Sequence, residues 1–298
     1  MKKKQFAIIG GDNRIKHAAV NLALTGSKVN VFGLDISGKY DNINRCERLD
    51  GEMFSSDVFV LPIPYKNQNG DINIIDWNIH LKPEDLFSQM RAGAILFYAK
   101  GDDEITNLCS KYKIYGYDIL KEETFAVLNA IPTAEGAIQR AMERTDITLH
   151  GAKILILGYG RIGKILSKML NGIGSNVTIA ARRAEELAWI KANGYQAIPI
   201  NELDAVLGEP DIVFNTIPAR ILNRCRLMKL QPDCCIIDLA SFPGGLDFEA
   251  AKEIGLNVSH ELGLPGTVAP RTAANIICQV IENILFRHSF TYPYHGGV

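Results

Sequence analysis

Residues 153–163 read Lys153-Ile154-Leu155-Ile156-Leu157-Gly158-Tyr159-Gly160-Arg161-Ile162-Gly163. The apolar run predicts a short buried strand, and the turn after it has the Gly-x-Gly-x-x-Gly spacing. A helical pattern through Leu170 follows, so the glycine turn stands between a strand and a helix. That is the context which a dinucleotide-binding fingerprint requires. The stretch therefore predicts a Rossmann domain in the second half of the chain.

The three glycines of the fingerprint have separate expected roles. Gly158 permits the tight turn, Gly160 lets the backbone approach a pyrophosphate, and Gly163 lets the helix pack closely on the strand. The helix that starts at Arg161 and Ile162 offers unpaired N–H groups and a favourable field for the phosphates. The alternative is a glycine turn in an α/β unit that binds nothing.

The end of the next predicted strand, 177–180, indicates which dinucleotide binds. NAD sites carry Asp or Glu about 20 residues after the glycine turn, where the carboxylate binds the ribose 2′-hydroxyl. This chain instead has Arg182 and Arg183, and no carboxylate before Glu185. Because a guanidinium offers paired donors to phosphate oxygens, the pattern favours NADP, with NAD as the other cofactor. The alternative is two solvated arginines that open a helix.

Two later strand ends complete the predicted cofactor groove. The segment 211–214 leads into Thr216, Ile217 and Pro218, and the segment 235–238 leads into Ala240 and Ser241. Ligands of open parallel sheets bind outside the carboxyl ends of the strands, so we expect the nicotinamide and its ribose here. The alternative is that these segments are simple turns.

The first half of the chain repeats the strand, glycine turn and helix order. Strands are expected at 6–9, 29–32, 57–61 and 94–97, and a helix at 15–24. A long helix over 133–148, with Pro132 before it and Thr133 as N-cap, is expected to bridge two domains. A further helix is expected after Pro270, followed by an irregular tail over 292–298.

These elements predict an α/β fold with two Rossmann-like, doubly wound parallel-sheet domains joined by a long bridging helix. The substrate-side domain is expected over 1–132, completed by the returning helix of 268–298. The cofactor-binding domain, with its bridging helix, is expected over 133–267.

The composition excludes several classes of protein. The 298 residues carry a formal net charge of −1, which gives no basic footprint for nucleic acid. No apolar run approaches the length of a membrane span, and the apolar start is too short for a signal peptide. The six cysteines form no Cys-x-x-Cys pair, so neither a disulfide framework nor a metal site is expected. These features indicate a cytoplasmic protein.

The order of the segments resembles the D-2-hydroxyacid dehydrogenases and alanine dehydrogenases. Four strings are more specific, and together they resemble the dipicolinate synthase A-subunit family of spore-forming bacteria over nearly the whole chain. They are Ile8-Ile9-Gly10-Gly11-Asp12, Asn129-Ala130-Ile131-Pro132-Thr133-Ala134-Glu135-Gly136-Ala137, Gly158-Tyr159-Gly160-Arg161-Ile162-Gly163 and Gly263-Leu264-Pro265-Gly266-Thr267-Val268-Ala269-Pro270.

The resemblance implies an NADP-dependent oxidoreductase in the mother cell of a sporulating bacterium. It would oxidise a dihydrodipicolinate-type intermediate of the lysine pathway to dipicolinate, together with a flavoprotein-like B-subunit. We also expect a homo-oligomer. The hydroxyacid dehydrogenases place a substrate-binding Arg just past the strand that carries Asp238, but Ser241 stands in that region. Their catalytic His precedes the returning helix, whereas the nearest histidine here is His260.

A ring dicarboxylate needs cations or helix N-termini to bind its two charges. The candidates are Arg14 in the first glycine turn, Lys100 after a strand, Thr133 at the bridging helix and Arg271 at the returning helix. His260 is the candidate general base. Each has a structural alternative: a solvated helix residue, a loop charge, a simple cap, an ion-pair partner and a hydrogen-bonded turn residue. We expect the substrate in a cleft between the domains.

Two other functions stay open at this point. One is a related hydroxyacid or amino-acid dehydrogenase. The other is a non-catalytic regulatory protein whose NADP-bound state controls a partner, because an intact fingerprint does not by itself require catalysis.

Overall fold

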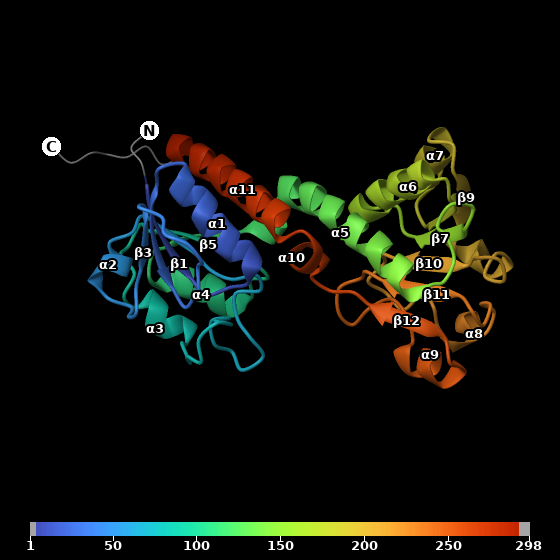
Figure 1. The fold of residues 1–298 in the computed structure, drawn as a ribbon, viewed down its shortest axis with the longest axis horizontal. Helices are drawn as coiled ribbons and strands as arrows, with labels where there is room; N and C mark the ends of the chain where they lie inside the picture. Colours follow the sequence, from blue (N-terminus) through green and yellow to red (C-terminus); the bar gives the residue numbers. More distant parts are fainter. Residues whose placement is uncertain (1–3, 292–298) are drawn as a thin grey trace. The chain divides into compact units, whose positions relative to one another are not determined.

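The computed structural model describes residues 4–291 (Figure 1). The chain divides into two compact units, one of residues up to Ala126 together with those from Ala269 onward, and one of Val127–Val268. Part of the expected returning helix and the whole expected tail, residues 292–298, lie outside the described residues.

The first unit contains a six-stranded parallel sheet in the order β3-β2-β1-β4-β5-β6. Its strands are β1 (Gln5–Ile9), β2 (Lys28–Phe32), β3 (Ile43–Arg45), β4 (Val58–Val60), β5 (Ile95–Tyr98) and β6 (Tyr115–Asp118). Its helices are α1 (Asn13–Leu24), α2 (Gly51–Phe54), α3 (Pro83–Phe87), α4 (Asp103–Lys111), the 3-10 turn η1 (Ile119–Lys121) and α11 (Pro270–Thr291). In Figure 1, α11 lies along α1, although the two helices are far apart in the sequence.

The second unit repeats this architecture, with the strand order β12-β11-β10-β7-β8-β9. Its strands are β7 (Lys153–Leu157), β8 (Asn176–Ala181), β9 (Gln196–Pro199), β10 (Ile212–Asn215), β11 (Cys235–Asp238) and β12 (Asn257–His260). Its helices are α6 (Arg161–Ile173), α7 (Ala184–Ala192), α8 (Arg224–Leu227), α9 (Phe248–Ile254), α10 (Leu264–Val268) and the 3-10 turn η2 (Ile200–Ala205).

Both sheets have the strand order 3-2-1-4-5-6 of the doubly wound dinucleotide fold when their strands are counted from the first in each unit. The apolar run of β7 explains why helices cover both faces of its sheet. Ile154 and Ile156 pack into one buried cluster, and Leu155 and Leu157 pack into another. Since successive side chains of a strand point to opposite faces, an all-apolar strand requires cover on both sides. The predicted fold class is confirmed.

The expected start of the long helix is wrong. Helix α5 runs over Glu123–Arg144, so Thr133 lies in its interior and caps nothing. The hydroxyl of Thr133 donates to the carbonyl of Asn129 at 2.7 Å, one turn back in the same helix. Pro132 also lies inside α5. Proline removes one backbone donor, but here the helix continues through it, so reading Pro132 as a boundary placed the start too late.

Several elements have no counterpart in the expectations. They include the edge strands β3, β6 and β9 and the short helix α10. Helix α10 occupies part of the Gly263–Arg271 segment that reads as a loop in the sequence. All six cysteines lie within the described residues and none is in a disulfide. No helix over residues 4–291 is long and apolar enough to cross a bilayer.

Candidate functional site

The glycine turn of the second unit has the geometry of a phosphate cradle. A Cβ added at Gly160 would meet no atom within 4 Å, so open space lies over this residue. A Cβ at Gly163 would stand 2.2 Å from the carbonyl oxygen of Gly158, which explains the close packing of α6 on the turn. Gly158 has a φ of +99°, a conformation that other residues rarely adopt. These are the properties that a bound pyrophosphate requires.

The first turn of α6 offers backbone donors to an anion. Gly160 is the N-cap of this 13-residue helix, and no side chain caps it. The first N–H groups of a helix have no partner within the helix, and the helix dipole places positive potential there. The turn that contains Arg161 and Ile162 therefore fits a phosphate group, as the sequence predicts.

A cavity of about 500 Å³ extends from this turn across the carboxyl ends of β7, β8 and β10. It is lined by Gly158, Tyr159, Gly160, Ala181, Arg182, Arg183, Glu186, Ile200, Thr216, Ile217, Pro218, Ala219 and Ile221. The cavity thus joins the fingerprint to the two arginines and to the segment after β10. Ala240 and Ser241 are not among its lining residues. Ile200 was missed because it follows β9, a strand that the sequence did not reveal.

The two arginines differ in their contacts. The guanidinium of Arg183 donates to Glu186 at 2.5 Å and lies 3.4 Å from Glu185. The hydrogen bond from Arg183 lowers the pKa of Glu186 below its usual value, so this pair stays charged at neutral pH. Arg182 is exposed and forms no ion pair with any described residue. Arg182 is therefore the arginine whose donors are available to a ligand.

A buried pair of polar side chains shapes the loops at the carboxyl ends of β10 and β11. The amide of Asn215 donates to Asp238 at 2.7 Å, and both residues are fully buried. Asp238 also accepts from the backbone N–H groups of Ala240 at 3.1 Å and Gly245 at 2.8 Å. One carboxylate therefore fixes both ends of the 240–245 loop. Sequence reasoning missed this role, because it depends on contacts across two strands.

His260 ends β12 in a defined orientation. Its Nε2 lies 2.8 Å from the carbonyl oxygen of Ala240, and its ring lies on Phe248 with 5.1 Å between centroids. A carbonyl oxygen can only accept, so Nε2 carries the hydrogen and neutral His260 keeps its lone pair at Nδ1. That arrangement can accept a proton at Nδ1.

The substrate candidates of the first unit differ in how far they are already engaged. Arg14 is held by Asp12 at 2.6 Å and by the carbonyl of Ile63 at 2.9 Å. Its side chain is 11% exposed, so its charge is largely neutralised inside the protein. Arg271 lies in the first turn of α11, as expected, and is exposed.

Lys100 follows β5 in a strained conformation. Its φ is +61°, which costs a residue with a Cβ about 1–2 kcal/mol relative to a right-handed conformation. The next residue, Gly101, donates its N–H to Asp118 at 3.0 Å, and this contact helps to fix the turn. The Lys100 side chain is exposed and forms no ion pair with any described residue.

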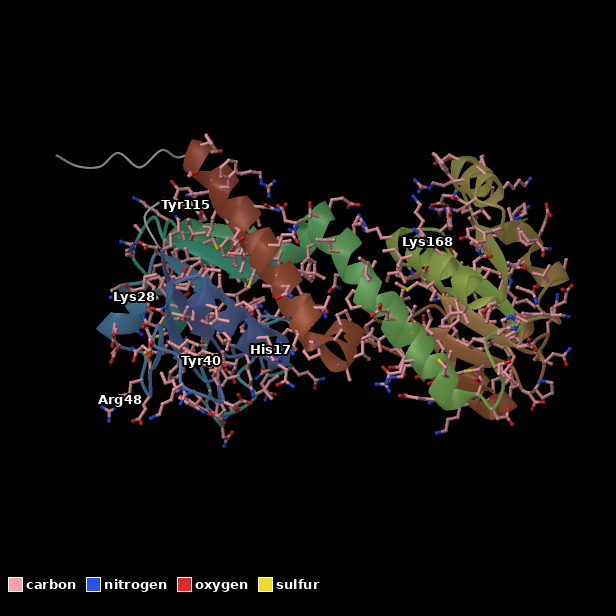
Figure 2. The ribbon with its side chains drawn as sticks, turned by 45° about the horizontal axis from the view of Figure 1, so that its top comes forward. His17, Lys28, Tyr40, Arg48, Tyr115 and Lys168 are labelled. Atoms are coloured by element: carbon pink, nitrogen blue, oxygen red, sulfur yellow. The ribbon has the colours of Figure 1, made fainter. Side chains whose placement is uncertain are left out.

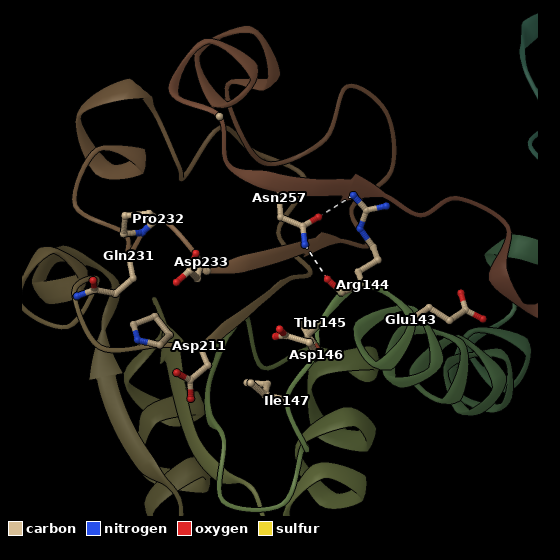
Figure 3. Close-up of a pocket in the computed structure, with 13 residues that line it drawn as sticks. Glu143, Arg144, Thr145, Asp146, Ile147, Asp211, Gln231, Pro232, Asp233 and Asn257 are labelled. Atoms are coloured by element: carbon tan, nitrogen blue, oxygen red, sulfur yellow. Dashed lines mark hydrogen bonds between the residues drawn. The ribbon is translucent and has the colours of Figure 1, made fainter.

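A second cavity, of about 910 Å³, lies at the amino ends of the strands of the second sheet, opposite the glycine turn (Figure 3). Its lining includes Arg144, Asp211, Asp233 and Asn257, which lie near the amino ends of β10, β11 and β12. Arg144 donates to the side chain of Asn257 at 2.8 Å, so its charge is used within the protein. Dinucleotides bind at the carboxyl ends of such strands, so this cavity is not the cofactor site.

Comparison with known proteins shows the family. The A-subunit of dipicolinate synthase from Bacillus subtilis (strain 168) is 31% identical over 284 residues, which are 94% of this chain and 95% of that relative. The chain belongs to the dipicolinate synthase A-subunit family. The family model for the N-terminal domain of that A-subunit matches residues 5–120, which confirms the resemblance stated from the sequence.

The family relationship extends to the fold of the whole chain. The crystal structure of the dipicolinate synthase A-subunit from Bacillus halodurans has a TM-score of 0.89 at 29% identity, and covers 95% of this chain and 98% of that one. An L-alanine dehydrogenase shares the fold alone, with a TM-score of 0.65 at 13% identity over 95% of this chain and 90% of that one.

The second unit has its own match. The family model for the NAD-binding domain of the D-isomer specific 2-hydroxyacid dehydrogenases matches residues 126–241. This range contains the glycine turn, both arginines and the segment after β10. The second unit therefore contains a dehydrogenase-type NAD(P)-binding domain, in agreement with the fingerprint.

Proposed function

We propose that this protein is an NADP-linked oxidoreductase that forms dipicolinate from a dihydrodipicolinate-type substrate, as one component of a dipicolinate synthase. The observation that carries the cofactor assignment is the open space over Gly160 beside the exposed Arg182, in one cavity. The reaction rests on membership of the dipicolinate synthase A-subunit family. A flavoprotein-like B-subunit would be its partner.

Different residues of the cavity would bind different parts of the dinucleotide. The first turn of α6 would hold the pyrophosphate, and Arg182 would bind the 2′-phosphate with paired donors. Thr216, Ile217 and Pro218 would pack against the nicotinamide half, and Ala240 and Ser241 would border it. When bound, oxidised NADP accepts a hydride from the substrate ring.

Lys100 is the cation of the first unit best suited to a substrate carboxylate. Its ammonium is exposed and unpaired among the described residues, whereas Arg14 is already bound by Asp12. Strained residues persist where the surrounding structure holds them, and they cluster at functional sites. Arg271 is the candidate for the second carboxylate.

The proton chemistry requires only one acceptor. Loss of a hydride and a proton from a dihydropyridine ring gives the aromatic ring, so the substrate itself supplies driving force. His260 would take that proton at Nδ1 while Nε2 stays bound to Ala240. The protein would otherwise act by holding substrate and cofactor in a reactive orientation.

The cofactor assignment is tested with Arg182→Ala and Arg183→Ala as a matched pair. Arg182→Ala should weaken NADP binding by about 1.5–3 kcal/mol, because a charge-assisted bond to phosphate is lost, and should leave NAD binding unchanged. Arg183→Ala should have the smaller effect, since Glu186 already binds that guanidinium. Calorimetric titration measures both. Equal affinity of the unchanged protein for NAD and NADP would contradict the assignment.

The substrate role of Lys100 is tested against Lys113, the other described non-glycine residue with a positive φ, at +56°. Lys113 lies before β6, at the amino ends of the strands, whereas Lys100 lies at their carboxyl ends. Both Lys→Gly variants should relieve backbone strain and raise the unfolding temperature. Only Lys100→Gly should raise KM, by roughly 10-fold to 100-fold, because only it removes a carboxylate ligand. Equal changes in KM would assign both lysines a purely conformational role.

The reaction is tested with the lysine-pathway intermediate and NADP, with and without the flavoprotein-like partner. Dipicolinate is read from the ultraviolet absorbance of its pyridine ring. If neither mixture yields dipicolinate while a 2-hydroxy acid is oxidised, the protein is a dehydrogenase of another substrate. If NADP binds but no substrate is turned over, it is a regulatory binding protein.

A further inference from the structure

An exposed aromatic ring stands on the loop that follows β11. Phe242 is 80% exposed, which is the largest exposed fraction of any large hydrophobic side chain over residues 4–291. It does not line the dinucleotide cavity, so the cofactor assignment gives it no role. Single exposed apolar side chains are common, so the support and the place of this ring decide whether it has a function.

The loop that carries Phe242 is fixed at its base. Asp238 accepts hydrogen bonds from the backbone N–H groups at both ends of the loop. A Cβ at Gly245 would stand 1.9 Å from the amide nitrogen of Asn215, so the loop packs directly on the end of β10. The base of the loop is therefore rigid while its tip is exposed. A ring on a rigid support loses little conformational freedom when it binds a partner.

The same loop is joined to His260, the candidate proton acceptor. The carbonyl of Ala240 accepts from Nε2 of His260 at 2.8 Å. The imidazole lies on the ring of Phe248, and a Cβ at Gly244 would stand 2.7 Å from that ring. Strands β11 and β12 pair with Asp238 opposite His260, so the loop and the imidazole lie at the same end of the sheet. The geometry of the loop thus also fixes the place of His260.

The two ends of strands β10, β11 and β12 offer different surfaces. At the carboxyl ends, the segments after the three strands carry the exposed apolar residues Pro218, Phe242 and Leu262. At the amino ends, the second cavity is lined by polar residues such as Asp211 and Asp233 (Figure 3). The exposed apolar groups therefore lie at the end of the sheet where the nicotinamide is expected.

The loop offers a flat apolar face but no charge. No Lys or Arg occurs between Asp238 and Lys252, so this segment has no cation for a carboxylate. An aromatic side chain packs well on another flat ring, with centroids about 4.5–7 Å apart. Phe242 therefore suits the ring of a ring dicarboxylate, whereas the two carboxylates need cations from other segments.

We propose that Phe242 packs against the ring of the substrate and of its aromatic product, and so selects a ring over an acyclic dicarboxylate. This inference rests on the proposed function, from which the ring substrate is taken. Phe242 covers one face of the ring and leaves the other face to the nicotinamide, as hydride transfer requires. It is a specificity-determining residue of that reaction.

The experiment measures how two dianions bind to the full chain saturated with reduced NADP. Dipicolinate contains the ring, and glutarate separates its carboxyl groups by an equally long chain of atoms without a ring. Phe242→Ala should weaken dipicolinate binding roughly 10-fold, because one aromatic contact is lost, and should leave glutarate binding unchanged. Phe242→Tyr keeps the ring and should retain the dipicolinate affinity. Calorimetric titration gives the first affinity, and competition with dipicolinate gives the second.

Two exposed residues of the second unit provide controls. Met228 follows α8 and is 67% exposed, and Lys168 lies on α6, where Figure 2 labels it. Met228→Ala removes apolar surface outside the loop, and Lys168→Ala removes a positive charge, so neither should change the affinity for either dianion. Lys100→Gly should instead weaken both dianions, because it removes a proposed carboxylate ligand.

The outcomes separate this inference from the proposed function. An equal loss of both dianions in Phe242→Ala, no loss of dipicolinate, or a loss in Phe242→Tyr as well would overturn the ring contact and leave the proposed function standing. A lower affinity of Phe242→Ala for reduced NADP would assign the contact to the cofactor and also overturn the inference. If the unchanged chain binds no dipicolinate, the proposed substrate is wrong and this inference fails with it.

Discussion

The two sheets of this molecule share one strand order, yet the carboxyl ends of their first strands differ. In the second unit, the turn after β7 leaves open space over Gly160. In the first unit, the turn after β1 is covered by the chain itself. A Cβ at Gly10 would lie 2.8 Å from the side chain of Ile74 and 2.9 Å from the carbonyl oxygen of Asn73.

The covering segment also makes polar contacts where a dinucleotide would make them. The N–H of Gly11, in the turn, donates to the carbonyl of Asn73 at 3.1 Å. Asp35, just past the end of β2, stands near the place where an NAD site carries its ribose-binding carboxylate. Here Asp35 accepts from the indole N–H of Trp77 at 2.9 Å, and its own N–H donates to Asp76 at 2.7 Å.

The comparison shows that strand order creates a crevice, and that the loops determine whether the crevice can bind a ligand. A doubly wound sheet creates a crevice at its switch point, and both units have that sheet. Whether the crevice binds a ligand depends on the residues that reach it. In the first unit, the segment Asn73–Trp77 fills it, so we expect one dinucleotide for each chain.

The largest effect should come from placing a side chain in each glycine turn. Gly160→Val should abolish measurable NADP binding without lowering the unfolding temperature, because the new side chain enters only open space. Gly10→Val should do the reverse, and destabilise the first unit by roughly 2 kcal/mol or more through strain and overlap. Calorimetry and thermal unfolding of both variants measure this. Lost NADP binding in a folded Gly10→Val protein would show that the first crevice binds the cofactor.

Shortening the side chain of Ile74, in the covering segment, should destabilise the first unit without creating a second dinucleotide site. Ile74 is 9% exposed, so Ile74→Ala should cost about 2–5 kcal/mol of unfolding free energy. The backbone bond from Gly11 to Asn73 remains, and the crevice stays closed. Denaturant unfolding gives the first quantity, and titration should still give one NADP for each chain. A stoichiometry of two would contradict our account of the covering segment.

The smallest expected effect is a loss of stability on acidification that comes from one histidine of the first unit. His288 of α11 is 7% exposed, its Nδ1 lies 2.7 Å from the Tyr117 hydroxyl, and burial, with a lesser contribution from Lys4, lowers its pKa from 6.5. A lowered pKa in the folded state means that unfolding takes up a proton. The contribution of neutral His288 to the free energy of unfolding is therefore fully present above pH 6.5. It is lost as the pH falls through the lowered pKa.

The measurement is the unfolding temperature between about pH 8 and about pH 5, where the unchanged chain should lose a few degrees. His288→Gln should reduce that loss. His17→Gln, on α1 of the same unit, is the control and should keep it. An unchanged pH profile in His288→Gln would assign the loss to other groups.

The second unit could be predicted from its sequence because its signals are local. The glycine spacing, the apolar run before it and the arginines after the next strand all lie within about 30 residues, as a βαβ unit requires. The cavity joins Gly158, Gly160, Arg182, Arg183 and the residues Thr216 to Pro218, as the strand ends indicate.

The remaining features depend on contacts that no local pattern contains. Pro132 reads as a boundary, although α5 begins at Glu123 and continues through it. Ile74 covers Gly10 and Gly33, which lie about 60 and 40 residues away in the sequence. Asp238 fixes a loop by bonds to Asn215 and Gly245. Each of these outcomes is decided by packing between segments that only the folded chain brings together.

The place of α11 has a consequence for how the chain is made. One part of the first unit precedes the second unit in the chain, but α11, whose apolar side chains pack on α1, comes after the whole second unit. Roughly 140 residues separate the two parts of the first unit. At about 5–20 residues per second, the ribosome needs about 7–30 s to make that stretch. The second unit, which is continuous, can thus complete its core during synthesis, while the part of the first unit that precedes it must wait for α11.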